Sequence, residues 1–210
     1  MLITAIEKRK LRPRVDVFVD GRLALSLSLA IAAAAGLRRG DDVTAGRLET
    51  LRQADERQQA RDAALRLLAY RPRSEAELRS RLVRRGLPAA VVEETMERLR
   101  EQGLLDDAAF ARYWVEARQR SSPRGRGLLR RELLAKGIAA ETASQAVAAV
   151  ADEDVARRAA VKKAHGLRNL DYPTFRRRLG QFLLRRGFPY ETARVLVDEL
   201  WRQSQRASSA

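Results

Sequence analysis

The sequence contains no cysteine and a single histidine, His165. Without cysteine, the chain can form neither a disulfide framework nor a thiolate metal site. One histidine excludes zinc clusters and sites built from paired imidazoles. We therefore expect no metal and no cofactor.

Long hydrophobic runs are also missing. The N-terminus lacks the apolar stretch of a signal peptide, and residues 23–37, which are broken by two serines and Gly36, are too short to span a bilayer. We expect a soluble, cytoplasmic protein that does not enter a membrane.

Acidic residues are scarce relative to basic ones. The 210 residues include 42 Lys and Arg against 27 Asp and Glu, which gives a net charge of +15. This balance is unusual for a protein whose partners are neutral metabolites. It indicates a polyanion or an acidic protein surface as the partner.

A pattern of about fifty residues recurs three times around Gly86, Gly137 and Gly187, which lie 51 and 50 residues apart. Leucines stand four and eight positions before each glycine, and apolar residues return ten and thirteen positions after it. Arg or Lys comes just before each glycine, as is typical of a helix that ends at a glycine in the left-handed conformation. The spacing predicts an elongated array of helices. The buried positions expected are Leu78, Leu82, Met96, Leu99, Leu129, Leu133, Val147, Val150, Leu179, Leu183, Val197 and Leu200.

The first part of the chain follows a different pattern. Two alternating runs, residues 14–19 and 22–27, flank Asp20-Gly21, which is a strong signal for a β-hairpin, and residues 3–8 could form a further strand. A short helix is expected from Ala30 to Ala35 and a long one from a cap near Thr44 toward Tyr70. The fold expected is therefore mainly all-α, with a small N-terminal β-hairpin element.

The helix signals divide the chain into five parts. Ser74 and Glu77 form a capping box at the start of the first glycine-terminated helix. Phe110, Tyr113 and Trp114 have the spacing of core residues on a later helix. The expected parts are an extension of hairpin and helix at 1–55, repeat 1 at 56–105, repeat 2 at 106–151, repeat 3 at 152–203 and a disordered tail at 204–210.

The sequence shows no catalytic constellation. The acidic residues between 93 and 107 follow the pattern of a solvated helix face, and a nuclease would need clustered carboxylates to hold metal ions. We therefore expect a binding protein and not an enzyme.

Positive charge is concentrated around the three glycine-terminated helices. Stacked repeats would align these helices into one basic stripe, and arginine favours bidentate contact with phosphate or carboxylate. The alternative is that arginine, a good helix former, merely covers solvated faces. The candidate partner-binding residues are Arg71, Arg73, Arg79, Arg84, Arg85, Arg118, Arg124, Arg126, Arg130, Arg131, Lys136, Arg176, Arg177, Arg178, Arg185 and Arg186.

Residues 64–79, Ala-Leu-Arg-Leu-Leu-Ala-Tyr-Arg-Pro-Arg-Ser-Glu-Ala-Glu-Leu-Arg, resemble the RecX family of regulators of the RecA recombinase. The similarity continues through Gly86, residues 91–99, residues 103–111 and Trp114, and from Gly125 to Gly137. Residues 3–9 and 15–21 look like the N-terminal extension of longer family members. The resemblance weakens only in the first helix of repeat 3 and in the tail.

This resemblance implies three tandem three-helix repeats that bind RecA and its nucleoprotein filament. Family members mostly restrain RecA in ATP hydrolysis, strand exchange and co-protease activity, and so act in DNA repair, recombination and the SOS response. The resemblance implies a non-enzymatic regulator, and we expect a monomer that binds single- or double-stranded DNA weakly. The other hypothesis is an autonomous basic DNA-binding protein.

Overall fold

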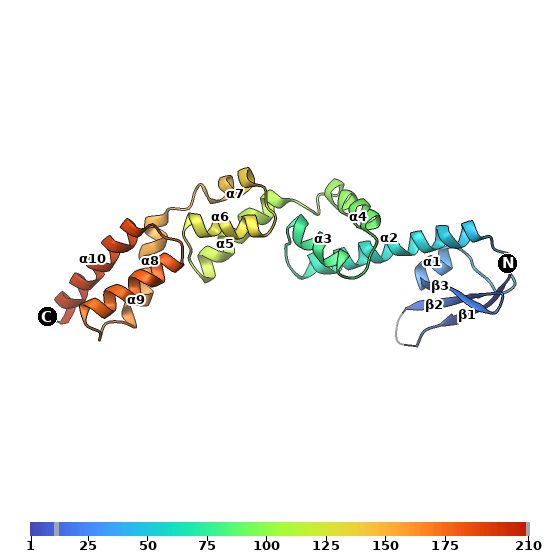
Figure 1. Ribbon diagram of the computed structural model, residues 1–210, viewed down its shortest axis with the longest axis horizontal. Coiled ribbons are helices and arrows are strands. Elements are labelled where there is room, and N and C mark those ends of the chain that lie inside the picture. The colour runs from blue at the N-terminus through green and yellow to red at the C-terminus, as the bar shows by residue number, and fades with distance from the viewer. Residues whose placement is uncertain (11–12, 209–210) are drawn as a thin grey trace. The chain divides into compact units, whose positions relative to one another are not determined.

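The protein is described from a computed structural model, which covers residues 1–10 and 13–208 (Figure 1). It is mainly helical, with one small sheet at the N-terminus. The strands are β1 (Ile3–Lys8), β2 (Arg14–Val19) and β3 (Arg22–Ser28). The helices are α1 (Leu29–Ala34), α2 (Ala45–Tyr70), α3 (Glu75–Val83), α4 (Ala89–Glu101), α5 (Asp107–Ser121), α6 (Arg126–Ala135), α7 (Ala140–Val147), α8 (Asp152–His165), α9 (Tyr172–Arg185) and α10 (Tyr190–Ser208).

The N-terminal sheet is antiparallel, with the strand order β1-β2-β3. Asp20 and Gly21 both have positive φ, 51° and 79°, as the tight turn of a two-residue hairpin requires. The predicted hairpin is therefore confirmed, and β1 adds a third strand to it. Ile3, Val17 and Leu27 are buried on the face that packs against the following helices.

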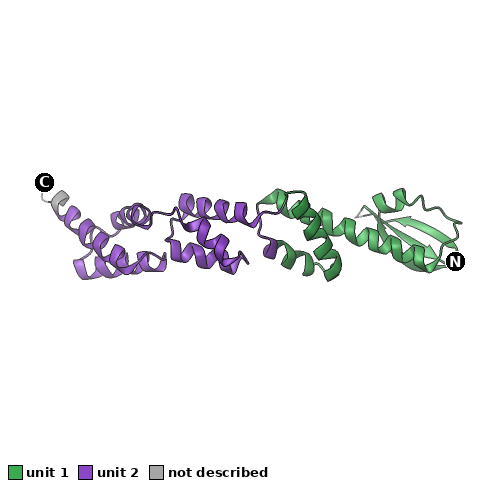
Figure 2. Cartoon of the chain, turned by 90° about the horizontal axis from the view of Figure 1, so that it is seen from above, with its two compact units in different colours: residues 1–71, 78–104 green, residues 72–77, 105–210 purple. Residues whose placement is uncertain are grey.

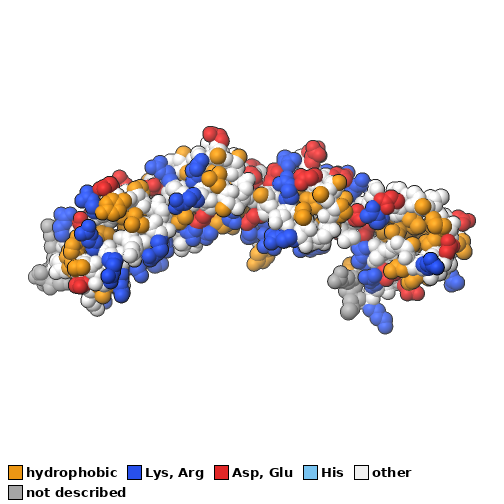
Figure 3. Space-filling model, viewed as in Figure 1, with side chains coloured by type: hydrophobic (Ala, Val, Ile, Leu, Met, Phe, Trp, Pro, Cys, Tyr) orange, Lys and Arg blue, Asp and Glu red, His pale blue; other side chains and the backbone are white. Residues whose placement is uncertain are grey.

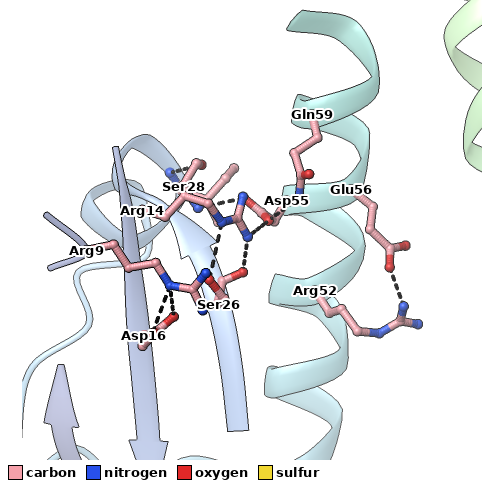
Figure 4. Close-up of polar contacts among 10 residues, drawn as sticks. Arg9, Arg14, Asp16, Ser26, Ser28, Arg52, Asp55, Glu56 and Gln59 are labelled. Atoms are coloured by element: carbon pink, nitrogen blue, oxygen red, sulfur yellow. Dashed lines mark hydrogen bonds and ion pairs between the residues drawn. The ribbon is translucent and has the colours of Figure 1, made fainter. Parts of the chain in front are cut away.

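A buried carboxylate fastens this sheet to α2 (Figure 4). Asp55 is only 3% exposed, and its carboxylate oxygens accept hydrogen bonds from Arg14 Nη2 at 2.8 Å, from the Ser28 backbone N–H at 2.7 Å and from Gln59 Nε2 at 2.7 Å. A buried charge is tolerated only where such partners replace water. Asp55 therefore fixes α2 against β2 and β3.

The helical repeat pattern is confirmed. The leucines four and eight positions before each glycine are all fully buried, and the apolar residues after it are at most 8% exposed. Gly86, Gly137 and Gly187 each have φ of +81°, the left-handed conformation expected of a residue just past a helix end. The periodicity of the sequence thus corresponds to the real core.

The chain divides into two compact units (Figure 2). Unit 1 comprises residues 1–71 and 78–104, and unit 2 comprises residues 72–77 and 105–210. Within unit 2, helices α5 to α10 share one hydrophobic core that extends from Phe110 to Leu200. Repeats 2 and 3 are therefore packed as one body and not as separate domains.

Two expected boundaries differ from the structure. The boundary expected between residues 55 and 56 lies inside α2, which runs unbroken from Ala45 to Tyr70. The expected tail, residues 204–210, is helical as far as Ser208, and residues 209–210 lie outside the described residues. The helix continues because no glycine or proline interrupts it.

Candidate partner-binding interface

Half of the sixteen residues of the predicted basic stripe are exposed. Two lie at the end of α3, two on α6 and four on α9, so that each glycine-terminated helix presents some of them. Figure 3 shows Lys and Arg side chains beside hydrophobic ones on the visible face of these repeats. The exposed residues are Arg84, Arg85, Arg126, Arg131, Arg176, Arg177, Arg178 and Arg185.

The other eight are buried or half-buried, and most of those take part in packing. Arg73 is only 7% exposed. Arg79 forms two hydrogen bonds with Glu93, and Arg130 Nε donates to Ser144 Oγ at 3.0 Å. The half-buried residues are Arg71, Arg79, Arg118, Arg124, Arg130, Lys136 and Arg186. Burial and these contacts reduce the availability of this half of the predicted stripe to a partner.

Trp114 has a different place from the one predicted. It is half-buried against the core of unit 2, but the Arg118 guanidinium and the Lys136 ammonium lie over its ring, at 4.2 and 4.1 Å from the ring centroid. Its Nε1 donates to Glu132 Oε2 at 2.9 Å. Phe110 is buried as expected, whereas Tyr113 is 38% exposed. Because the Trp114 ring lies at the edge of the core, Arg118 and Lys136 can reach it, and cation–π contacts hold both side chains in place.

Glu132 is the acidic centre of this region, and no motif in the sequence marks it as a functional residue. Its carboxylate accepts a hydrogen bond from Arg118 Nε at 3.0 Å and is ion-paired with Arg124. The pKa of the Arg124 guanidinium is lowered, mainly because the group is partly buried and also because Arg118 and Arg186 repel its charge. Arg118 and Arg124 share one carboxylate, and Arg186 adds a further positive charge near Arg124, so an anionic partner would relieve the repulsion among them.

Arg186 joins repeat 3 to repeat 2. Its Nη1 donates to the Pro123 carbonyl at 3.0 Å, its guanidinium lies 4.5 Å from the Phe182 ring centroid, and its backbone carbonyl accepts from the Gly125 N–H at 2.9 Å. Partial burial lowers its pKa. Arg186, a candidate partner-binding residue, therefore also belongs to the packing between repeats 2 and 3.

The contact between repeats 2 and 3 leaves no space for side chains at two glycines. A Cβ on Gly125 would lie 2.4 Å from the Gly187 carbonyl oxygen, and a Cβ on Gly187 would lie 2.4 Å from Leu128 Cβ. This close approach places α6 and the end of α9 side by side. Arg126 and Arg185 thereby belong to one compact unit.

Residues 72–77 make the corresponding contact with the end of α6. Ser74 Oγ accepts from the Glu77 N–H at 3.2 Å, which confirms the predicted N-cap, and it donates to the Lys136 carbonyl at 2.6 Å. Lys136 Nζ donates to Glu77 Oε1, also at 2.6 Å. Ser74 and Glu77 therefore stabilise the start of α3 and also bind residues 72–77 to the end of α6.

Two neighbouring acidic residues of repeat 1 are engaged by arginines. Glu93 pairs with Arg79, and Glu94 pairs with both Arg57 and Arg98. No group of three or more His, Cys, Asp or Glu residues suited to a metal ion occurs among the described residues. In the same part of the chain, no helix is both long and apolar enough to cross a bilayer.

Three family models match the helical part of the chain in succession. They describe the first, second and third three-helix domains of RecX, and they match residues 60–99, 106–147 and 151–197. Each match contains one of the three glycine-terminated helices. The models therefore follow the same repeat as the buried leucines.

Whole-chain comparisons agree with this result. The regulatory protein RecX of Geobacillus kaustophilus is 32% identical over 202 residues, which are 93% of this chain and 75% of that protein. The regulatory protein RecX of Amycolatopsis mediterranei is 36% identical over 147 residues, 69% of this chain and 84% of the relative.

Solved structures show the same fold. A crystal structure of regulatory protein RecX superposes with a TM-score of 0.65 at 24% identity and covers 94% of this chain and 98% of that one. The crystal structure of RecX from Lactobacillus salivarius has a TM-score of 0.61 at 25% identity and covers 70% and 97%. With three consecutive domain matches and relatives aligned over most of its length, the chain belongs to the RecX family of regulatory proteins.

Proposed function

We propose that the chain is a non-enzymatic, monomeric regulator that acts in the cytoplasm, binds the RecA recombinase and its nucleoprotein filament, and mostly inhibits ATP hydrolysis, strand exchange and co-protease activity. The observation that carries this proposal is the set of eight exposed arginines on the glycine-terminated helices of a RecX-family chain. A filament offers both DNA phosphates and acidic protein surface. Arginine can engage either group through two parallel hydrogen bonds.

The packing of repeats 2 and 3 supports multivalent binding. Arg126, Arg131 and the four exposed arginines of α9 belong to one compact unit with one core. Because these arginines are linked through one core, the first contact with a repeating partner brings the next arginines close to further acceptor groups. Linked contacts of this kind raise avidity well beyond that of one site.

Substoichiometric amounts of the protein are expected to lower ATP hydrolysis by RecA on single-stranded DNA, while the protein alone hydrolyses neither nucleotide nor phosphodiester. The reason is that binding along a filament affects more than one recombinase subunit. The measurement is the steady-state rate of phosphate release with and without the protein. Unchanged RecA turnover at saturating protein would contradict the proposed function.

Direct binding to DNA is expected to be weak and strongly salt-dependent. Each phosphate contact contributes about −0.7 to −0.9 to the slope of log K against log salt concentration. Exposed tyrosines on the repeats are few, Tyr70, Tyr113 and Tyr190 among the described residues, so base stacking adds little. Fluorescence anisotropy with labelled single- and double-stranded DNA over a salt series measures this slope. Sequence-specific binding that persists at high salt would favour the autonomous DNA-binding protein instead.

A further inference from the structure

A side-chain bridge closes the groove between the second and third helices in repeats 1 and 2. Arg79 stands seven residues before Gly86 and Glu93 seven after it, and the two side chains form hydrogen bonds of 2.7 and 3.1 Å. Arg130 and Ser144 hold the same positions around Gly137, and Arg130 Nε donates to Ser144 Oγ at 3.0 Å. An arginine on the glycine-terminated helix thus reaches the next helix in both repeats.

Repeat 3 lacks this bridge. The residue seven positions before Gly187 is Gly180, and the residue seven positions after it is Arg194. Glycine has no side chain with which to reach α10, and Arg194 turns toward Glu191 on its own helix, with an Nη2 to Oε2 distance of 3.0 Å. The groove between α9 and α10 is therefore left open.

The open groove has a volume of about 200 Å³ and an apolar interior. Gly180 and Leu184 of α9 face Ala193 and Val197 of α10 across it, and the exposed Tyr190 ring stands beside it. Leu184 is 44% exposed, so that apolar surface is accessible to a partner. The volume suits one large side chain and is smaller than the pockets that hold drug-sized ligands.

Cations surround this apolar interior. Arg176, Arg177 and Arg194 line its rim. The one carboxylate in the lining, Asp198, accepts a hydrogen bond from the Tyr172 hydroxyl at 2.7 Å. The rim is therefore complementary to acidic groups that flank an apolar anchor.

Packing does not explain the glycine at position 180. Glycine in a helix interior is unfavourable relative to alanine, and such a residue usually has a structural or functional reason. A Cβ built on Gly180 would meet no atom within 4 Å. The absence of a side chain there keeps the groove empty, and no close approach of another element requires it.

We propose that the groove between α9 and α10 receives one large apolar side chain from an acidic segment of a protein partner. This proposal rests on the proposed function in taking the recombinase as that partner. The apolar side chain fills the space above Gly180, while Arg176 and Arg177 pair with the flanking carboxylates. A nucleobase fits the groove less well, because most of its accessible interior surface is apolar and therefore cannot form the hydrogen bonds that read a base edge.

The direct test titrates two peptides into the full chain and follows methyl resonances by NMR. One peptide is a heptamer of Asp and Glu with a central Phe, and the other carries Ser in place of Phe. We expect shifts at the methyls of Leu184, Ala193 and Val197, with at least about tenfold weaker binding of the Ser peptide. Equal binding of the two peptides, or stronger shifts of these methyls with oligo-dT, would overturn the proposal.

The matched variants are Gly180→Leu and Gly46→Leu. Each places a leucine in a helix where a Cβ meets no atom within 4 Å, but Gly46 lies on the exposed start of α2, in the unit that does not contain the groove. Gly180→Leu should fill the groove, keep its helical circular dichroism and abolish the peptide-induced shifts. Gly46→Leu should bind as the parent does. Unaltered peptide binding by Gly180→Leu would refute the assignment of the groove.

A second measurement separates this inference from the proposed function. Gly180→Leu should bind RecA filaments on single-stranded DNA at least about tenfold more weakly than Gly46→Leu does. If the parent bound the Phe peptide but no filament, the proposed function would fail while the groove assignment stood. If both variants bound filaments equally, the groove would not be a recombinase site.

Discussion

Replacing Gly187 with Ala is expected to destabilise unit 2 by about 3 kcal/mol. A non-glycine residue in the left-handed conformation costs roughly 1–2 kcal/mol, and forcing extra atoms into a packed contact costs roughly 1–3 kcal/mol. At Gly187 both apply, because φ is +81° and the new Cβ would lie 2.4 Å from Leu128 Cβ. The loss of stability is measured by urea unfolding that is monitored by tryptophan fluorescence, since Trp114 and Trp201 both belong to unit 2.

Gly86→Ala is the matched control for this substitution. Gly86 has the same φ of +81°, but a Cβ there would meet no atom within 4 Å. Only the backbone cost of about 1–2 kcal/mol should appear, in the thermal unfolding of unit 1 followed by circular dichroism. Equal losses in the two variants would show that the contact between repeats 2 and 3 tolerates a methyl group.

Reversing the charge at Arg131, Arg178 and Arg185 together is expected to weaken filament binding at least about a hundredfold. Each substitution replaces an attractive charge pair with a repulsive one, and the loss of several linked contacts also lowers the avidity. All three side chains are exposed, and none lines the groove between α9 and α10. Substitution by Glu should therefore leave the core intact and act through lost contacts with phosphates or carboxylates. Surface plasmon resonance with immobilised RecA filaments, together with thermal unfolding, measures the two quantities.

The control for charge reversal is the triple change of Arg22, Arg39 and Arg47 to Glu. These residues are equally exposed and lie in the N-terminal part of unit 1. The change in net charge is the same, so a general electrostatic effect would weaken binding equally in both variants. Equal weakening would refute the assignment of the basic interface to the glycine-terminated helices.

The repeat architecture could be predicted because it depends on local chemistry. Leu78, Leu129 and Leu179 follow the helical period, and a glycine after a basic residue marks a helix end in each repeat. The hairpin could be predicted for the same reason, since Asp20-Gly21 fits only a few turn types. Each of these signals is contained within a dozen residues of sequence.

The sequence could not predict which arginines pair with residues of the protein itself and which remain exposed. Arg79 on α3 and Arg84 just past its end look alike in the sequence, yet Arg79 is bound to Glu93 of α4 whereas Arg84 is exposed. Arg118 and Arg124 are drawn together by Glu132, which lies in another helix. These partners are set by tertiary packing, and no local pattern encodes them.

The buried carboxylate of Asp55 and the open groove beside Gly180 escaped prediction for a related reason. Asp55 reads as one of many charges on a polar helix, and only the docking of β2 and β3 makes it a buried acceptor. From the sequence alone, Gly180 is only a residue of low helix propensity. That it leaves a groove open becomes clear only when the bridges formed by Arg79 and Arg130 in the other repeats are known. Comparison of corresponding positions across the repeats could have indicated the second feature.

Helix α2 sets the orientation of the N-terminal sheet by its residue count. Asp55 holds the sheet, and Arg57, two residues later, donates to Glu94 of α4 at 2.8 Å. Each residue of an α-helix adds about 100° of rotation and 1.5 Å of rise. Insertion of a single residue between the sheet contacts and the α4 contacts would therefore turn the sheet by more than a quarter of a circle about the axis of α2. The number of residues in α2 between the sheet contacts and the α4 contacts therefore sets the angle between the sheet and a partner bound to repeat 1.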